Sequence, residues 1–250
     1  MDEVLLFEWA FTPSDYFGEP VKLRCTHGTI NIENGCAVLQ VPVVNCASDH
    51  SVRSQLHEEL DALFLAAQVL SHKPYKLDSP KVSKRYPDGR IDAWGTFSGV
   101  EAVGQVSGIG LDTTHSDPSG TVIHNSHRPR LQERNDFAQL AAHHMSDHVA
   151  NGILRSYSAA VNDPNNELVH LYEIYDVLKK HFNGVERAIS KLGANKDWEP
   201  LHKLANFEPL RQGRHRGQSL GRLRDATVEE LATARKIARD MIKRYLRFLN

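Results

Sequence analysis

The chain has 250 residues, which is enough for one large domain or two modest ones. Its hydrophobic fraction of 40% and charged fraction of 24% are typical of a globular protein. Thirty basic residues balance thirty-one acidic ones, so the overall charge gives no indication of an acidic partner. Only a local cluster of basic residues can provide that argument.

The composition also argues against a membrane protein and a secreted protein. No apolar run approaches the roughly 18 residues of a membrane span, and the acidic start Met1-Asp2-Glu3 is unlike a secretory signal. Three cysteines (Cys25, Cys36 and Cys46) are an odd number in a long chain and predict reduced thiols. We therefore expect a soluble, cytoplasmic protein with no membrane contact.

The first part of the chain has the patterns of β-strands. Continuous or alternating apolar residues are bounded by turn signals, and Asn34-Gly35 has the composition of a tight hairpin turn. These patterns predict strands at Val4–Phe11, Val21–Cys25, Thr29–Glu33 and Cys36–Val44.

Residues 52–71 have helical spacing of leucines, and the Pro-containing stretch Lys73–Arg90 is predicted as a loop. Further strands are expected at Ile91–Phe97, Val100–Leu111 and Gly120–His124. The prediction for residues 1–128 is thus a β-rich α+β domain, with an antiparallel sheet and one main helix.

The apolar period changes to 3.6 residues after a basic linker at His124–Arg134. Asp163-Pro164 predicts a helix start, and Thr227 with Glu230 forms a capping-box pattern. Helices are expected over 135–161, from Pro164 to Phe182, over Val185–Leu192, over 197–207, and from Thr227 onward. Residues 129–250 are therefore predicted to be an all-α bundle.

The strongest local signal for chemistry is the segment before the last helix. From Arg211 to Arg224 it holds five arginines, one histidine and three glycines, with no acidic residue until Asp225. Arginine binds phosphate through a bidentate fork, and histidine transfers protons near neutral pH. Together they could cleave RNA without a metal, because the nucleophile is the RNA's own 2′-hydroxyl. Alternatively, the arginines are structural and pair with acidic residues of neighbouring helices.

Two stretches resemble a known family: Leu168-Val169-His170-Leu171-Tyr172-Glu173-Ile174-Tyr175, and the run from Leu204-Ala205-Asn206-Phe207 to Arg214-His215. They resemble the helical domain of bacterial HEPN-type proteins, in particular the ApeA-like and methylamine-utilisation MauJ-like groups. The resemblance covers about residues 135–250. It implies a HEPN-like helical bundle, and for many members a metal-independent ribonuclease of phage defence or stress response that acts as a homodimer.

The family signature is an arginine, a polar residue, and a histidine after four to six intervening residues. By this resemblance Arg211 and Arg214 hold the phosphate, and His215 is the acid or base. The other residues expected at the substrate are Arg216, Gln212, Asn206 and Glu208. Only three residues separate Arg211 from His215, which on a helix would still place both on one face.

Two clusters of possible metal ligands are set aside. His144 and His148 lack the glutamate of a His-Glu-x-x-His site, and Cys25, Cys36, Cys46 and His50 lack paired Cys-x-x-Cys spacing. The sequence therefore predicts no metal and no cofactor, with RNA and a second copy of the chain as partners, and a protein partner for the N-terminal domain.

The alternative is a non-catalytic interaction or dimerisation module with a structural Arg/His loop. Exposure of Arg211, Arg214 and His215 at a two-fold cleft would favour catalysis. Burial of each against acidic side chains would favour the module.

Overall fold

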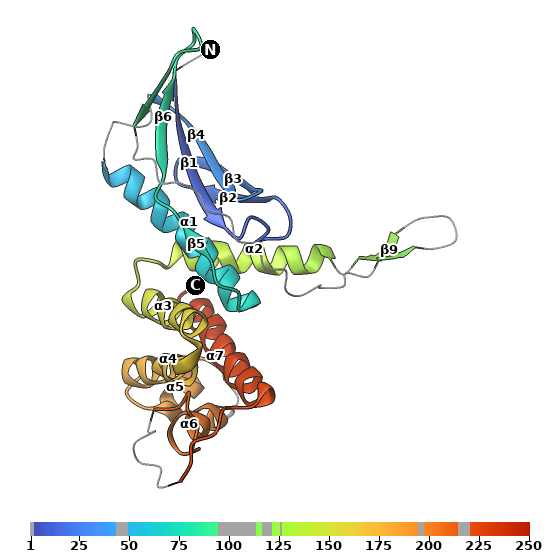
Figure 1. The fold of residues 1–250 in the computed structure, drawn as a ribbon, viewed down its shortest axis with the longest axis vertical. Helices are drawn as coiled ribbons and strands as arrows, with labels where there is room; N and C mark the ends of the chain where they lie inside the picture. The colour runs from blue at the N-terminus through green and yellow to red at the C-terminus, as the bar shows by residue number, and fades with distance from the viewer. Residues whose placement is uncertain are drawn as a thin grey trace. The chain divides into compact units, whose positions relative to one another are not determined.

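The computed structural model describes residues 3–43, 50–94, 114–116, 122–125, 127–194, 198–214 and 221–250. The chain divides into two compact units (Figure 1). The first comprises residues 1–64 and 75–139, and the second comprises residues 65–74 and 140–250. Residues 129–139 fall in the first unit, whereas the sequence patterns predicted them in the bundle, so the boundary near residue 128 stays a prediction.

The first unit is built on an antiparallel sheet, as the sequence predicted (Figure 1). Among the described residues it has seven strands in the order β2-β3-β4-β1-β6-β7, with β5 also paired to β1. The strands are β1 (Val4–Thr12), β2 (Val21–Cys25), β3 (Gly28–Glu33), β4 (Cys36–Pro42), β5 (Lys76–Leu77), β6 (Lys81–Arg85) and β7 (Ile91–Trp94). Two further strands, β8 (Thr114–Ser116) and β9 (Val122–Asn125), pair with each other.

The predicted hairpin at Asn34-Gly35 is confirmed. Glu33 pairs with Cys36, so the two residues between them form the whole turn. Asn34 has φ 50° and Gly35 has φ 78°, the left-handed conformations that a tight hairpin of this twist requires. A Cβ at Gly35 would also come within 3.0 Å of the Ser14 Cβ, so glycine is required for space as well.

Helix α1 (His50–Ser71) and the strands together supply the apolar core of the first unit. Leu56, Leu60 and Phe64 are fully buried. The Phe64 ring lies 5.1 Å from Phe11 of β1 and 4.8 Å from Phe17, which fixes this part of the helix against the sheet. The last turns of α1 belong to the second unit, which begins at Leu65.

Two segments that the sequence predicted to lack regular secondary structure contain a strand or a helix. The stretch Lys73–Arg90 is not a loop throughout, because β6 lies within it and pairs with β1 from Val4 to Glu8. The stretch His124–Arg134 is not a linker, because β9 ends at Asn125 and a helix begins at His127. The predicted strand Val100–Leu111 lies outside the described residues.

The helix predicted over 135–161 is two helices. They are α2 (His127–His143) and α3 (His148–Asn162), separated by four residues that include Asp147. The Asp147 side chain caps α3 by accepting a hydrogen bond of 2.7 Å from the Ala150 N–H. The Tyr245 hydroxyl also donates to Asp147, at 3.2 Å.

The second unit is a helical bundle (Figure 1). Besides α3 it contains α4 (Glu167–His181), α5 (Val185–Lys191), α6 (Glu199–Asn206) and α7 (Val228–Phe248). Thr227 and Glu230 form the predicted capping box of α7. Asp163 does not cap α4, because the helix starts only after a 3₁₀ turn at Pro164–Asn166.

A buried charge lies where α4 meets α7. Glu167 is 1% exposed and accepts two hydrogen bonds, of 2.6 and 2.8 Å, from the Arg235 guanidinium. The His72 Nε2 atom lies 3.6 Å from the same carboxylate. Burial, and secondly the charge of Arg235, lowers the pKa of His72 from 6.5 to about 4.

Sheet and helices together confirm the α+β class. Across the described residues, no helix combines the length and the apolarity that crossing a bilayer demands.

Candidate functional site

The ends of the arginine-rich segment are held together by the backbone. Leu210 and Arg224 form a short parallel β-bridge. The Arg211 N–H donates to the Arg224 carbonyl at 3.0 Å, and the Arg224 N–H donates to the Pro209 carbonyl at 3.0 Å. Residues 215–220 lie outside the described residues, so the site consists of Arg211–Arg214, Gly221–Ala226 and their neighbours.

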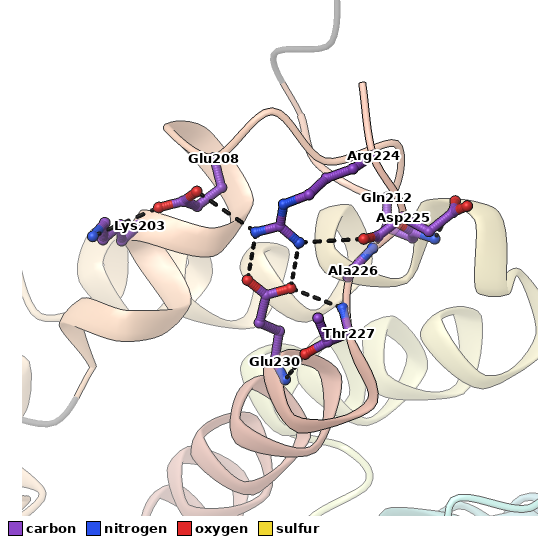
Figure 2. Close-up of polar contacts among 8 residues, drawn as sticks. All are labelled: Lys203, Glu208, Gln212, Arg224, Asp225, Ala226, Thr227 and Glu230. Carbon is purple, nitrogen blue, oxygen red and sulfur yellow. Dashed lines mark hydrogen bonds and ion pairs between the residues drawn. The ribbon is translucent and has the colours of Figure 1, made fainter. Parts of the chain in front are cut away.

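Arg224 is fully engaged by carboxylates (Figure 2). Its guanidinium donates two hydrogen bonds to Glu230, of 2.7 and 2.6 Å, and lies 3.8 Å from Glu208. Glu208 also pairs with Lys203 at 3.6 Å. Hydrogen bonding to Arg224 lowers the pKa of Glu230 from 4.5 to about 2. This arginine therefore fastens the segment to the start of α7.

Gln212 forms hydrogen bonds with the residues just before α7 (Figure 2). Its amide oxygen accepts from the Ala226 N–H at 3.1 Å, and its amide nitrogen donates to Asp225 at 3.4 Å. Both contacts join the two ends of the arginine-rich segment, so the Gln212 side chain stabilises this segment.

Of Arg211, Arg214 and Arg224, Arg211 has the weakest side-chain contacts. Its nearest described carboxylate is Asp225, at 3.9 Å, and its side chain is 57% exposed. An exposed pair at this distance contributes little to stability. The main-chain bond to Arg224 fixes the Arg211 backbone, while the guanidinium remains accessible to a ligand.

Arg214 is held against α4. Its guanidinium donates to Asp176 at 2.9 Å and lies 4.6 Å above the centre of the Tyr172 ring, a cation–π arrangement. Burial, and secondly the charge of Asp176, raises the pKa of Tyr172. The Arg214 side chain is still 37% exposed, so it is accessible from one side.

A close approach of two backbones positions Arg214. The Arg214 N–H donates to the Ala205 carbonyl at 2.7 Å. A Cβ at Gly213 would lie 3.2 Å from that same carbonyl oxygen, so a larger residue there would push the loop away from α6.

Two of the predicted site residues, His215 and Arg216, lie outside the described residues. Asn206 is at the end of α6, where its amide donates to the His202 carbonyl at 3.0 Å. A second contact of Asn206, to the Tyr172 side chain, links α6 to α4. The structure thus brings Arg211, Gln212, Arg214, Asn206 and Glu208 to one end of the bundle.

Sequence reasoning missed the acidic and aromatic partners of this site. Asp176 lies one helical turn after Tyr172 on α4, so the sequence predicted that these two side chains are neighbours. It did not predict that Arg214, which is far away in the sequence, would contact them. Phe207 was assigned to the predicted helix 197–207, yet it lies just beyond α6 and is 71% exposed.

Comparison of the chain with protein-family models, with curated proteins and with solved structures gives no match. Among the described residues, there is no group of three or more histidine, cysteine, aspartate or glutamate side chains that could hold a metal ion. The chemistry that the described site can supply is positive charge and hydrogen-bond donors, from Arg211 and in part from Arg214.

Proposed function

We propose that the Arg211–Arg224 segment binds the phosphate backbone of RNA and that the protein is a HEPN-like, RNA-directed protein. The observation that carries the proposal is Arg211. Its backbone is fixed, its guanidinium is exposed, and its nearest described carboxylate, Asp225 at 3.9 Å, forms only a weak exposed pair with it. An exposed guanidinium on a fixed backbone can bind a phosphate bidentately.

The activity that we propose for this site is metal-independent RNA cleavage, with a role in phage defence or stress response. The ribose 2′-oxygen attacks its own phosphorus, the bond to the 5′-oxygen breaks, and the 2′-hydroxyl proton ends on the departing 5′-oxygen. His215 moves a proton to or from these oxygens, and Arg211 and Arg214 stabilise the charge on phosphorus. Two copies of the chain in a cytoplasmic homodimer would bring two such sites together.

A second candidate function is a non-catalytic interaction module. Two of the arginines favour it, because Arg224 is bound by Glu230 and Arg214 by Asp176. In that case the segment only closes the bundle, and its contacts serve stability. The two functions make opposite predictions for Arg211, which has no strong structural partner among the described residues.

RNA binding by variants at Arg211 tests the proposal. We expect Arg211→Ala to weaken binding of a single-stranded RNA and to lower the slope of log affinity against log salt by about 0.7, the loss of one phosphate contact. Arg211→Lys should weaken binding less, because the charge remains while the fork is lost.

Arg224→Ala is the matched control, because it removes an arginine of the same segment that is already paired. It should lower the melting temperature, and its effect on the salt slope should be smaller than that of Arg211→Ala. Equal affinity and equal salt slope for wild type and Arg211→Ala would favour the interaction module.

A further inference from the structure

A hollow of about 550 Å³ lies between the start of α6 and one face of α7, within the helical unit. Trp198 and Pro200 line it from α6, and residues from Thr233 to Arg244 line it from α7. No residue of the Arg211–Arg224 segment is among the described residues that line it. A hollow of this size has room for a small organic molecule.

The lining of this hollow is strongly cationic. Its nine described residues include four basic side chains, Lys236, Arg239, Lys243 and Arg244, and one carboxylate, Asp240. Asp240 accepts a hydrogen bond of 2.6 Å from Arg244, so these two charges neutralise each other. The charge that remains favours a ligand with negative charge.

The other three cations form a row along α7. Lys236, Arg239 and Lys243 follow one another at intervals of three and four residues, so the row is about 10 Å long at 1.5 Å per residue. Like charges at this spacing repel each other and destabilise a helix. Arg239 has an internal partner in the Tyr157 side chain, whereas Lys236 is exposed. Helix stability therefore does not explain the row, and an anion beside it would remove the repulsion.

Apolar side chains line the same hollow. They are Trp198, Pro200 and Ile237. Trp198 is only 2% exposed, and its indole N–H has no hydrogen-bond partner among the described residues. Buried donors are normally bonded, so this one lacks an acceptor that a ligand could supply. An inorganic ion would leave the apolar part of the lining unused, which favours an organic ligand.

We propose that this hollow binds a small organic anion, with its phosphate or carboxylate on the cations of α7 and its apolar body against Trp198, Pro200 and Ile237. The site is separate from the proposed RNA site, and neither depends on the other. A nucleic acid can also bind a basic helix face through its phosphates. It would contact the cations without filling the hollow, so the apolar lining favours the small molecule.

Ligand-observed NMR titrations of the full chain with four probes test the proposal. Phenylphosphonate and benzoate carry an anionic group and a ring, inorganic phosphate carries only the charge, and benzyl alcohol carries only the ring. The variants at the hollow are Lys236→Gln and Ile237→Ala, and thermal melts check that both are folded. Lys180→Gln is the matched control, because Lys180 is an exposed lysine that does not line the hollow. Arg211→Ala reports any binding at the proposed RNA site.

We expect phenylphosphonate or benzoate to bind about 10-fold more tightly than inorganic phosphate or benzyl alcohol, because only these two probes use both parts of the lining. The tighter of the two identifies the anionic group. Lys236→Gln should weaken the better probe about 5-fold through loss of a charged contact. Ile237→Ala should weaken that probe and leave inorganic phosphate unchanged. Lys180→Gln and Arg211→Ala should match wild type.

Four results would overturn the proposal, and none of them bears on RNA binding by Arg211. The first is that neither phenylphosphonate nor benzoate binds. The second is that inorganic phosphate binds as tightly as they do, which would show charge attraction alone. The third is binding that is lost in Arg211→Ala and kept in Lys236→Gln, which would place the probe at the RNA site. The fourth is displacement of the bound probe from Arg211→Ala by an oligouridylate, which would assign the cations of α7 to nucleic acid.

Discussion

At the scale of single residues, the described arginines of the candidate site differ in what holds them. Glu230 binds Arg224 through two short hydrogen bonds. Arg214 has one carboxylate and one aromatic ring as partners. Arg211 has only a carboxylate oxygen at 3.9 Å. Charge neutralisation therefore falls along this series, and Arg211 is the one of these three arginines best able to exchange its partner for a phosphate.

The pair between Arg224 and Glu230 predicts a pH dependence. The pKa of Glu230 falls from 4.5 to about 2 in the folded chain, so the unfolded chain binds the proton more readily. The contribution of Glu230 to stability is therefore present above pH 4.5 and is lost as the pH falls through 2. Urea unfolding between these pH values should show a smaller fall in stability for Glu230→Gln than for wild type. Parallel curves for the two proteins would contradict this assignment.

The sequence identified the segment that contains the candidate site, but it did not show which of its arginines are paired with carboxylates. A run of arginines without acidic neighbours marked the segment. The partners that neutralise Arg214 and Arg224 are Asp176, on α4, and Glu208 and Glu230, outside the run. Only folding brings Asp176 within 2.9 Å of Arg214, so local spacing could not separate the weakly paired Arg211 from the strongly paired Arg214 and Arg224.

At the scale of elements, the sequence correctly predicted those caps and turns that are formed by residues close together in the chain. The capping box at Thr227 and the turn at Asn34-Gly35 are formed by neighbouring residues, and both are confirmed. Strand β6 was missed because Lys81-Val82-Ser83-Lys84-Arg85 has little apolar pattern of its own. It is a strand because β1, at the other end of the unit's sequence, pairs with it from Val4 to Glu8.

The break between α2 and α3 gives a prediction for Asp147. This side chain caps α3 and accepts the hydroxyl of the buried Tyr245. Asp147→Ala removes the cap and leaves that hydroxyl without its partner, and should cost about 1–2 kcal/mol of unfolding free energy. Asp147→Asn keeps an oxygen acceptor and should cost less. Urea denaturation of the two variants measures the difference, and an equal cost would show that capping is not what Asp147 contributes.

At the scale of the whole molecule, the helical unit carries a buried ion pair that fixes α4 against α7. Glu167→Ala leaves the partly buried Arg235 without its bidentate partner. We expect a loss of about 3 kcal/mol in unfolding free energy, because an unpaired charge remains. Asp88→Ala, at an exposed pair with Arg90, is the matched control and should leave the urea midpoint nearly unchanged. Similar midpoints for both variants would contradict a structural role of the Glu167 pair.

The apolar end of α7 bears on the predicted homodimer. Near the end of α7, Tyr245 is fully buried and bonded to Asp147. Phe248 remains 45% exposed. A two-fold dimer through the bundle stays a prediction, and any apolar contact from this end of α7 would centre on Phe248.

The most direct test of the account is RNA cleavage by the purified chain in the presence of EDTA. Wild type should cut single-stranded RNA and leave a 2′,3′-cyclic phosphate or 3′-phosphate, because the nucleophile belongs to the RNA. His215→Ala should keep RNA binding and lose about 10²–10⁴-fold in rate, the usual contribution of proton transfer. Arg211→Ala should weaken binding and slow cleavage. Intact RNA with wild type at concentrations that saturate binding, or equal cleavage by His215→Ala, would contradict the proposed ribonuclease.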